Sequence, residues 1–556
     1  MGWPARDCQS RGLSWAQISW WRSPVSGWRF QRETNQMAEL ICYDGVGCIG
    51  GNKILLKTGE TRLFLDFGLN FGIQGRFYQE FLQPKSVAGL FEPIEMGILP
   101  PFRGMYRDDL VSRCADPYRE CSKEWEDPGE INAILLSHAH VDHMGLLNYV
   151  REDIAIFCSP MTLAIARALQ DTAGGSVPAE YCYYVPRQDG ENGSGLATPH
   201  QSKQPSLSRH YAVTSAPSKK LETFWGGRPG ERGHIPRELR TVEDVAGCPV
   251  KSWPVDHSLY GATAWAVQTD AGWVVYTGDL RTHGRAGQLT WRFAEEAAAL
   301  EPVALIIEGT RINSSQRYTE QDVRDASLDR VKECSGLVVA DFGPRNVERL
   351  LSFLEVARQT GRRLAILPKD AYLLHTMQKA ADSHQKVPSL NDTCIVIYRE
   401  LSGTNPSWQK VLWEDGNLDG RIVAPTDIRN HPEDYIICLS FFDLNELAYL
   451  RPPEGSIWIY SACEALNEEM EIDAARMRAW LDHFRVRLVG NLTNKDHEED
   501  PFHVSGHASG EDLVRIAEII HPQKLIPVHT EHPDLFCQKM PFTEVVLPEP
   551  GKPIFL

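Results

Sequence analysis

The sequence predicts an α/β protein that folds as more than one domain. The chain has 556 residues and 42% hydrophobic content, which is enough for more than one buried core. Residues 336–342 are an apolar run of strand length, residues 362–367 read as another strand, and residues 347–357 between them carry apolar side chains at near-helical spacing. This β-α-β alternation is typical of a parallel sheet covered by helices. Other apolar runs end in histidine or a carboxylate, which indicates a polar site at strand ends.

One short segment directly after the apolar run 134–136 contains His138, His140, Asp142 and His143. Burying three imidazoles and a carboxylate costs free energy unless each polar group has a partner. Imidazole nitrogen and carboxylate oxygen are zinc ligands, at about 2.0–2.2 Å. Because side chains alternate along extended chain, His138 and His140 point the same way, while Asp142 and His143 lie in the turn beyond. The segment therefore predicts a split site for two metals, with a solvated histidine-rich loop as the alternative.

Further apolar runs are each followed by a residue that can bind a metal or transfer a proton. They are Asp66 after 63–65, His257 after 254–255, Asp279 after 274–277, Glu308 after 305–307 and His529 after 526–528. The segment His503-Val504-Ser505-Gly506-His507 adds two imidazoles.

In this order, the motifs up to Asp279 resemble those of the metallo-β-lactamase superfamily. The motifs from Glu308 onward resemble its β-CASP nuclease branch, and the form His-x-Ser-Gly-His-Ala followed by Pro-Val-His is similar to that of ribonuclease J. The resemblance covers most of residues 38–556 and is patchy between the motifs. It implies a metallo-β-lactamase αββα sandwich interrupted by an inserted β-CASP α/β domain.

The resemblance also implies a set of metal ligands. One metal would be held by His138, His140 and His257, and the other by Asp142, His143 and His529, with Asp279 bridging the two. Asp66 is expected behind the ligands, where it fixes their orientation without binding metal.

The same resemblance assigns roles in catalysis. The catalytic residues it implies are Asp142, Glu308 and His507. His507 is expected to steady transition-state charge or to protonate the leaving oxygen, and Glu308 is expected to orient His507 by a hydrogen bond. His503 and Ser505 are expected to hold a substrate phosphate. Arg345 and Arg349 are expected to contact phosphate as well, with salt bridging as the alternative.

The implied reaction is hydrolysis of RNA phosphodiester bonds, internally or from the 5′ end, by two-metal activation of water. Zn²⁺ is the expected metal, and the mixed nitrogen and oxygen ligands also permit Mn²⁺. Single-stranded RNA is the expected partner, with DNA left open. Alternatives are a hydrolase of a small ester, thioester or lactam, a DNA-directed β-CASP nuclease, and a non-catalytic RNA-binding subunit.

Composition limits the partners and the cellular compartment that are expected. The net charge of −17 argues against a surface that binds polyanions generally. The 13 cysteines lack zinc-finger spacing, and neither a secretory signal nor a membrane-length apolar run is visible, which indicates a cytoplasmic protein without membrane contact.

Four segments are expected along the chain. Residues 1–37 are an accessory tail or a misassigned start, with translation beginning at Met37. Residues 38–310 and 454–556 form the metallo-β-lactamase domain, and 311–453 form the β-CASP domain. The C-terminal assembly domain of long ribonucleases J is expected to be missing after the His529 region, and the oligomeric state stays open.

Within the first part, residues 185–237 are expected to form a flexible surface insertion. Their Gly, Ser, Gln and Pro content buries too little apolar area to offset the ordering of the chain. The basic residues of this segment are candidates for contact with a polyanion, with a solvated loop as the favoured alternative: Lys219, Lys220, Arg228, Arg232 and Arg237.

Overall fold

The structure is a computed structural model that describes residues 38–79, 81–200, 203–242, 244–315, 318–343, 345–380, 385–414, 420–461, 468–492 and 500–556. The predictions for residues 1–37 lie outside the described residues. Among the helices described, none combines the length and the apolar character needed to cross a membrane.

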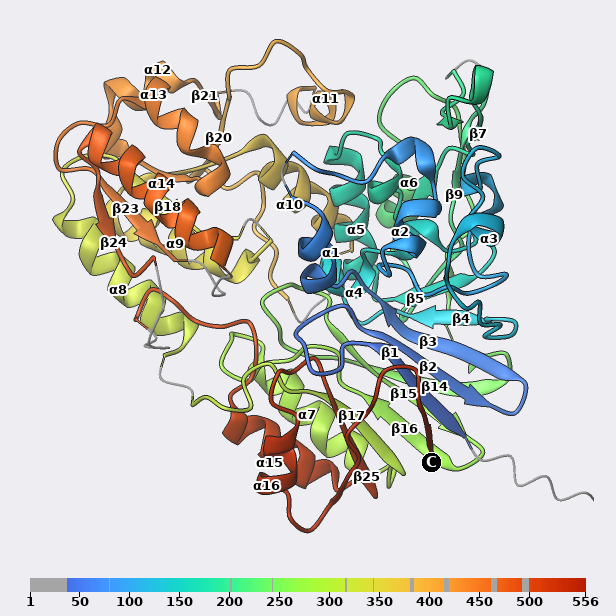
Figure 1. Cartoon of the computed structure of the whole chain (residues 1–556). Coiled ribbons are helices and arrows are strands. Elements are labelled where there is room, and N and C mark those ends of the chain that lie inside the picture. Colours follow the sequence, from blue (N-terminus) through green and yellow to red (C-terminus); the bar gives the residue numbers. More distant parts are fainter. Residues whose placement is uncertain are drawn as a thin grey trace, which may run out of the picture. The chain divides into compact units, whose positions relative to one another are not determined.

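The first lobe contains two sheets packed face to face (Figure 1). One has the strand order β12-β10-β5-β4-β3-β2-β1-β27, and the other has the order β13-β14-β15-β16-β17-β25-β26. The strands of the first sheet are β1 (Glu39–Asp44), β2 (Lys53–Thr58), β3 (Thr61–Phe67), β4 (Ala133–Leu135), β5 (Ala155–Cys158), β10 (Tyr211–Val213), β12 (Arg240–Thr241) and β27 (Pro553–Phe555). Those of the second are β13 (Asp244–Val245), β14 (Cys248–Pro254), β15 (Thr263–Thr269), β16 (Gly272–Tyr276), β17 (Ala304–Glu308), β25 (Lys524–Val528) and β26 (Glu544–Val545).

Apolar side chains fill the space between these sheets and cover their outer faces. Leu56 and Leu65 of the first sheet meet Trp265 and Ile306 of the second in one buried cluster. Each large apolar side chain removed from water contributes roughly 1.5–3 kcal/mol before entropic costs. Helix α5 (Pro160–Thr172) packs outside the first sheet, and α7 (Gly287–Ala298) and α15 (Gly510–Ile520) pack outside the second. The predicted αββα sandwich is confirmed.

A second lobe contains a seven-stranded sheet in which every pairing is parallel, with the order β21-β20-β19-β22-β18-β23-β24. Its strands are β18 (Val338–Asp341), β19 (Arg363–Ile366), β20 (Ile395–Tyr398), β21 (Ile422–Val423), β22 (Tyr435–Cys438), β23 (Ile457–Tyr460) and β24 (Arg487–Val489). Its helices include α8 (Glu320–Glu333), α9 (Val347–Thr360), α10 (Pro368–Ala380), α11 (Ser407–Trp413), α12 (Pro425–Asn430) and α14 (Glu468–Phe484). The predicted strand–helix–strand unit is β18-α9-β19.

The expected return to the first lobe at residue 454 is wrong. Strand β23 pairs in parallel with β18, and β24 pairs with β23, so both belong to the inserted sheet. Met477 and Leu481 of α14 pack in the core of the same lobe. The run Ile457–Tyr460 is apolar enough for either sheet, and only long-range pairing decides which one it joins.

The expected flexible insertion at residues 185–237 is also wrong for much of its length. Strand β10 pairs in parallel with β5 and so is part of the main sheet. Helix α6 (Lys219–Trp225) buries Leu221 and Trp225 against it. The Gly- and Ser-rich stretch forms the small hairpin of β7 (Gln188–Asp189) and β8 (Leu196–Ala197). Short apolar runs anchor a segment whose average composition is that of a loop.

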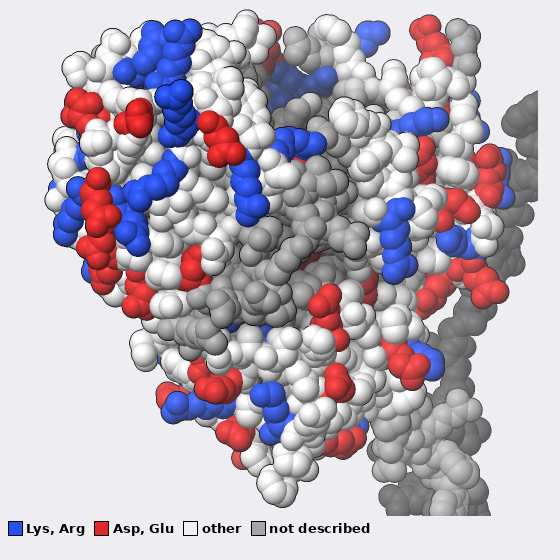
Figure 2. Space-filling view, turned by 60° about the vertical axis from the view of Figure 1, so that its left-hand side comes forward, with Lys and Arg blue, Asp and Glu red and all other residues white. Residues whose placement is uncertain are grey.

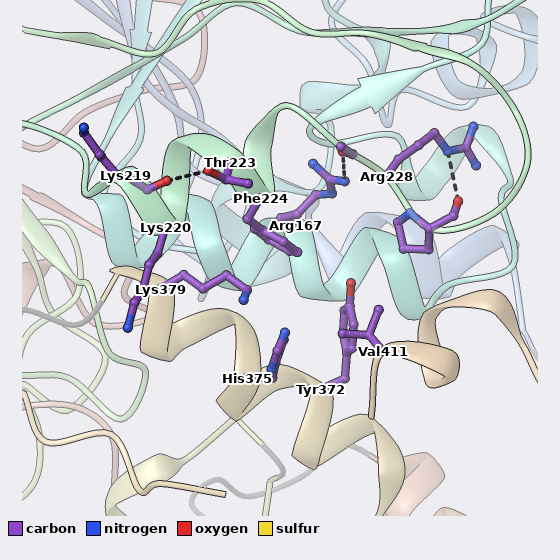
Figure 3. A pocket seen from close by; sticks show the side chains of 12 residues that line it. Arg167, Lys219, Lys220, Thr223, Phe224, Arg228, Tyr372, His375, Lys379 and Val411 are labelled. Carbon is purple, nitrogen blue, oxygen red and sulfur yellow. Dashed lines mark hydrogen bonds between the residues drawn. The ribbon is translucent and has the colours of Figure 1, made fainter. Parts of the chain in front are cut away.

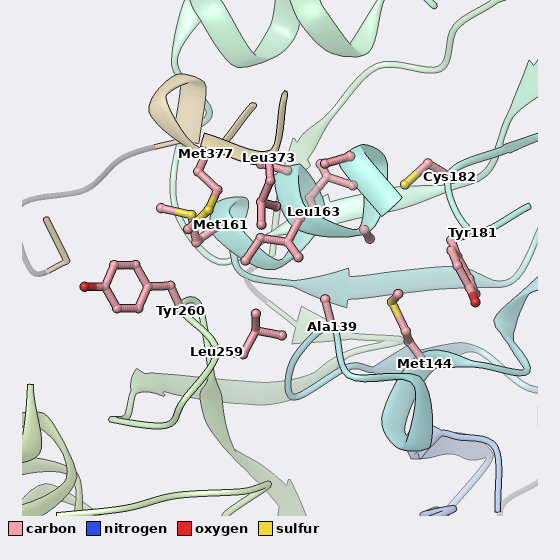
Figure 4. Packing of buried hydrophobic residues seen from close by; sticks show 14 of the residues in the cluster. Ala139, Met144, Met161, Leu163, Tyr181, Cys182, Leu259, Tyr260, Leu373 and Met377 are labelled. Atoms are coloured by element: carbon pink, nitrogen blue, oxygen red, sulfur yellow. The ribbon is translucent and has the colours of Figure 1, made fainter. Parts of the chain in front are cut away.

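The two lobes share one continuous apolar core. Met161 and Leu163 of α5 contact the cluster that contains Leu373 and Met377 of α10, from the inserted lobe (Figure 4). Ala139 lies in the same cluster, between two predicted metal ligands. Packing between the lobes therefore reaches the backbone of the candidate site.

Candidate metal centre

The predicted ligands converge where loops from both sheets of the first lobe meet. His138 and His140 follow β4, and the short helix α4 (Val141–Met144) carries Asp142 and His143. From the other sheet, His257 follows β14, Asp279 follows β16 and His529 follows β25. All seven side chains are buried or half-buried.

In the first group, four side chains place one ligand atom each within 4.8 Å of one another: His138, His140, His257 and Asp279. His140 Nδ1 lies 2.9 Å from His138 Nε2 and 3.2 Å from His257 Nε2. Asp279 Oδ2 lies 3.6 Å from His138 Nε2 and 3.8 Å from His257 Nε2. Four ligands at zinc-bonding distance in a tetrahedron are about 3.3 Å apart, which these separations approach.

The second group contains Asp142, His143, His529 and again Asp279. His143 Nε2 lies 3.1 Å from Asp279 Oδ2, and His529 Nε2 lies 3.2 Å from Asp142 Oδ2. Asp279 thus borders both groups, which is the position that bridging two cations requires.

The electrostatics of the groups suit cations. Burial lowers the pKa of His138 and of His257 well below the ordinary range, so both imidazoles are neutral and offer lone pairs. His143 Nε2 and Asp279 Oδ1 are buried without a hydrogen-bond partner in the described part of the chain. An unsatisfied buried polar atom costs roughly 1–3 kcal/mol, which a bound cation would offset. The donor set therefore fits two divalent metals.

Asp66 holds the second group from behind. One of its oxygens accepts from Ser137 N at 2.6 Å, and the other lies 2.7 Å from His143 Nδ1. The Tyr276 hydroxyl donates to the same carboxylate at 2.6 Å. With Nδ1 of His143 bound to Asp66, its Nε2 faces the cluster. Asp66 has a φ of 59°, a left-handed conformation that the surrounding bonds maintain.

Two other imidazoles are oriented through their Nδ1 atoms. His257 Nδ1 lies 2.7 Å from the carbonyl oxygen of Gly506, and His529 Nδ1 lies 2.8 Å from the Thr310 hydroxyl. Each contact leaves Nε2 directed to the ligand group. Thr310 comes from the segment after β17, so that segment orients a ligand as well as contributing Glu308.

Gly68 allows α4 to approach β3 closely. A Cβ atom at this position would lie 1.6 Å from the carbonyl oxygen of Asp142. The neighbouring Leu69 N donates to Val141 O at 3.1 Å. Glycine here lets the backbone that carries Asp142 and His143 pack directly on the end of β3.

Glu308 and His507 form a pair next to Asp279. His507 Nδ1 lies 3.0 and 3.1 Å from the two carboxylate oxygens, and the three residues place ligand-type atoms within 4.8 Å of one another. Glu308 also accepts from Leu280 N at 3.0 Å and from Thr310 N at 3.1 Å. These bonds fix the carboxylate, which in turn fixes the His507 ring.

The predicted phosphate contacts lie in different surroundings. Half-buried His503 and buried Ser505 belong to the loop before His507, whose backbone N donates to Ser505 Oγ at 3.1 Å. Arg345 is half-buried at the turn before α9, within electrostatic range of Tyr181. Arg349 is fully buried and donates to both oxygens of Glu320 at 3.0 Å, so it forms a buried ion pair.

The sequence did not single out a buried ion network beside the site. Arg281, just after Asp279, pairs with Asp256 at 3.1 Å, with Glu320 at 3.3 Å and with Glu348. Asp256 precedes His257, whereas Glu320 and Glu348 come from the inserted lobe. Glu320 and Glu348 lie 39 and 67 residues from Arg281 along the chain, so the sequence did not predict this association. The charges of Asp256 and Arg281, close to the predicted ligands His257 and Asp279, were the available signal.

His283 is a second residue that sequence reasoning missed. Its Nε2 lies 2.9 Å from the carbonyl oxygen of Ser505, and burial lowers its pKa to about 3. The neutral ring therefore donates a hydrogen bond that ties the loop after Asp279 to the loop before His507.

Comparison with known proteins finds similar sequences over most of the chain. Residues 500–540 match the family described as a Zn-dependent metallo-hydrolase RNA specificity domain. Ribonuclease J of Helicobacter pylori (strain ATCC 700392 / 26695) is 19% identical over 92% of this chain and 58% of its own length. Ribonuclease J 2 of Streptococcus pyogenes serotype M3 is 20% identical, over 76% of this chain and 64% of its own. The chain thus spans less than two thirds of these relatives.

A solved structure shares the fold. A protein of unknown function from Enterococcus faecalis V583 superposes with a TM-score of 0.62 and 22% sequence identity, over 94% of this chain and 100% of that one. The matched domain contains His503, Ser505, His507 and His529. In sequence the chain is similar to ribonuclease J over most of its length, and its fold is the αββα sandwich with an inserted α/β lobe that this resemblance implies.

Proposed function

We propose that this chain is a metal-dependent ribonuclease that hydrolyses phosphodiester bonds of single-stranded RNA. The observation that supports it best is that Asp279 belongs at once to two metal-type groups and to the group with Glu308 and His507. A phosphodiester needs water activation, neutralisation of phosphate charge and a proton for the leaving oxygen. Groups suited to each of these tasks meet at one carboxylate.

Two divalent ions, Zn²⁺ or Mn²⁺, would supply Lewis acidity that activates water and offsets phosphate charge. We assign the ligands as the sequence predicts: His138, His140 and His257 in one group, Asp142, His143 and His529 in the other, with Asp279 between them. Their fixed orientation is the chain's own contribution, because Asp66, the Gly506 carbonyl and Thr310 hold the rings of His143, His257 and His529.

Glu308 and His507 would handle the proton. Glu308 binds Nδ1 of His507 and so leaves Nε2 to steady charge or to protonate the leaving oxygen. Positioned acid–base help of this kind is typically worth about 10²–10⁴-fold in rate. His503 and Ser505, on the loop that leads to His507, would hold a substrate phosphate next to this pair.

The first experiment incubates the full chain with end-labelled single-stranded RNA and Zn²⁺ or Mn²⁺. The wild type is expected to shorten the RNA, whereas His140→Ala is expected to abolish cleavage because it removes a central ligand. His483→Ala, an exposed histidine on α14, is the matched control and should cleave like the wild type. Equal products from wild type and His140→Ala would refute the proposal.

A second set of substrates defines the reaction. RNA with a 5′-monophosphate is compared with RNA bearing a 5′-triphosphate, and DNA and a chromogenic lactam are tested in parallel. Preference for the monophosphate, reduced in Ser505→Ala, is expected if the loop forms a phosphate pocket for degradation from the 5′ end. Turnover of the lactam without RNA cleavage would favour a small-substrate hydrolase.

A further inference from the structure

A basic cavity lies outside the metal centre, between helices of the two lobes (Figure 3). It has a volume of about 540 Å³ and lies between α5 and α6 on one side and α10 and α11 on the other. Its cations are Arg167, Lys219, Lys220, Arg228 and Lys379, with His375 beside them. None of the described residues that line it is acidic.

This composition is unusual for a chain with a net charge of −17. On the face shown in Figure 2, basic and acidic side chains are interspersed. In the cavity, Lys219, Lys220 and Arg228 of the segment expected to be a solvated loop meet residues of α10 from the other lobe. Grouping like charges costs electrostatic free energy, which an anionic ligand would offset.

Two buried donors point to such a ligand. Arg167 is 1% exposed; its Nε bonds to Asp171 at 3.0 Å and its Nη2 to Gly227 O at 2.6 Å. Its Nη1 has no hydrogen-bond partner among the described residues, and the same holds for Nη1 of Arg228. Asp171 balances part of the Arg167 charge from behind. The buried guanidinium of Arg167 and the half-buried guanidinium of Arg228 therefore each keep one donor that the described residues do not use.

Aromatic rings hold the cations in place. The guanidinium of Arg167 lies 5.0 Å and the ammonium of Lys379 lies 5.5 Å from the centre of the Phe224 ring. Figure 3 shows Lys379 and His375 reaching from α10 toward α6. Because α6 and α10 come from different lobes, the cavity depends on their fixed packing, which the bond from Ser218 Oγ to Lys379 O supports at 2.6 Å.

We propose that this cavity binds the phosphate group of a nucleotide, either a unit of an RNA strand or a free mononucleotide. Arg guanidinium and Lys ammonium groups are the side chains that bind phosphate. The volume is that of a small-molecule site and exceeds what a phosphate alone would fill, and the apolar surface of Val411 and Phe224 suits the attached nucleoside. The RNA alternative rests on the proposed ribonuclease function, whereas the mononucleotide alternative does not.

The test is direct binding to the full chain carrying His140→Ala, so that RNA is not cut. The probes are a short fluorescent single-stranded RNA, followed by anisotropy, and AMP, followed by calorimetry. The pocket variant Lys219→Gln/Lys220→Gln removes two exposed cations from the cavity. The matched control Lys332→Gln/Lys539→Gln makes the same charge change at exposed lysines elsewhere.

If the lysines contact RNA phosphates, each lost contact lowers affinity about 5-fold at about 0.1 M salt, or about 25-fold for the pair. The slope of log affinity against log salt should become shallower by about 1.4 in the pocket variant only. If the pocket variant loses binding of RNA alone, the ligand is an RNA strand. If it loses binding of AMP, the ligand is a free nucleotide.

Equal binding by the pocket and control variants, for both probes, would overturn the proposal, as would an equal loss in both. Because binding is measured without turnover, this result is separate from the cleavage assay. If the wild type cleaves RNA and the pocket variant binds both probes as well as the control does, the cavity proposal is rejected and the ribonuclease proposal is retained. If the wild type cleaves no RNA but the pocket variant loses AMP binding, the ribonuclease proposal is rejected and the cavity proposal is retained.

Discussion

At the scale of the residue, Asp66 controls the second ligand group without being one of the predicted ligands. Its carboxylate accepts hydrogen bonds from the Ser137 backbone, from the Ser137 hydroxyl at 2.7 Å and from Tyr276, and it binds His143 Nδ1. Four bonds to one buried carboxylate maintain its left-handed backbone and the ring orientation of His143. This residue is where a small chemical change should affect metal affinity most selectively.

We predict that Asp66→Asn weakens metal binding about 10–100-fold, the usual effect of losing a residue that orients a ligand. Asparagine adopts left-handed backbone readily, so the change adds little strain. Its amide can accept from the Ser137 backbone but places a donor against His143 Nδ1 or Tyr276. Affinity is measured by competition with a chromophoric chelator.

Tyr276→Phe is the control for the Asp66 variant, because it removes one hydrogen bond to the carboxylate and preserves the bond to His143. It should weaken metal binding much less. Unchanged affinity in Asp66→Asn, with normal folding, would mean that His143 needs no support from this carboxylate.

At the scale of the element, the loops after β14 and β16 are tied to α8 and α9 by Arg281. The guanidinium and its partners Asp256, Glu320 and Glu348 are all buried. Removing the cation from such a network leaves carboxylates buried without compensation, which typically costs about 3–5 kcal/mol. We predict that Arg281→Met lowers the free energy of unfolding by about that amount, as measured by chemical denaturation.

Arg285→Met is the matched comparison. Arg285 is partly exposed, with 38% of its side chain accessible, and pairs with Glu355 at 2.8 Å. An ion pair in such surroundings is worth about 0–1 kcal/mol, so this variant should change stability little. Adding Asp256→Asn to Arg281→Met should recover part of the loss, and similar small effects of both single arginine variants would contradict a structural role for the network.

The carboxyl edge of the inserted sheet holds two buried acids, Asp341 at the end of β18 and Asp370 in the first turn of α10. Burial raises the pKa of each to about 7, and the charge of Asp443 adds to both effects. Glu400 raises the pKa of Asp370 further, Lys369 opposes it, and Trp458 donates to Asp341 at 2.9 Å. The folded protein therefore keeps these protons at a pH where the unfolded chain has lost them.

The sign of the pH dependence follows from this difference. The folded pKa lies above the unfolded value, so each group lowers the free energy of unfolding as pH rises from about 4 to about 7, by up to about 4 kcal/mol, and contributes no further change above pH 7. We predict that Asp370→Asn gains stability relative to the wild type as pH rises through this window. Melting temperatures on both sides of it give the difference.

The exposed Asp329→Asn is the control, and its stability relative to the wild type should be nearly independent of pH in that window. A constant difference between Asp370→Asn and the wild type across the window would show that the Asp370 carboxyl is ionised in the folded protein throughout.

At the scale of the whole molecule, sequence pattern predicted the strands and their polar ends but not all of their partners. Asp279 and His529 were found because each lies in a motif, behind an apolar run, that resembles one of the family's motifs in the expected order. The sheet that Ile457–Tyr460 joins depends on pairing with β18, more than a hundred residues away. The sequence did not predict the Arg281 network either, because its partners are distant along the chain and because isolated charges are more often exposed than buried.

The position of the metal centre predicts how the first lobe responds to metal. Its ligands come from loops of both sheets: His138, His140, Asp142 and His143 follow β4 of one, and the others follow β14, β16 and β25 of the second. Bound metal would thus link the two halves of the sandwich. Binding to the folded state alone stabilises it by about 2.7 kcal/mol at a hundredfold excess over the dissociation constant.

We therefore predict that Zn²⁺ or Mn²⁺ raises the melting temperature of the full chain and that a chelator reverses the rise. Asp279→Asn should lose most of this shift, because Asp279 borders both ligand groups, whereas Asp329→Asn should keep it. Weak binding of metal to histidines of the unfolded chain reduces the shift in all three proteins alike, so their comparison removes that contribution. If Asp279→Asn were stabilised as much as the wild type, the metal would bind elsewhere, and the two sheets would be held together by their apolar core alone.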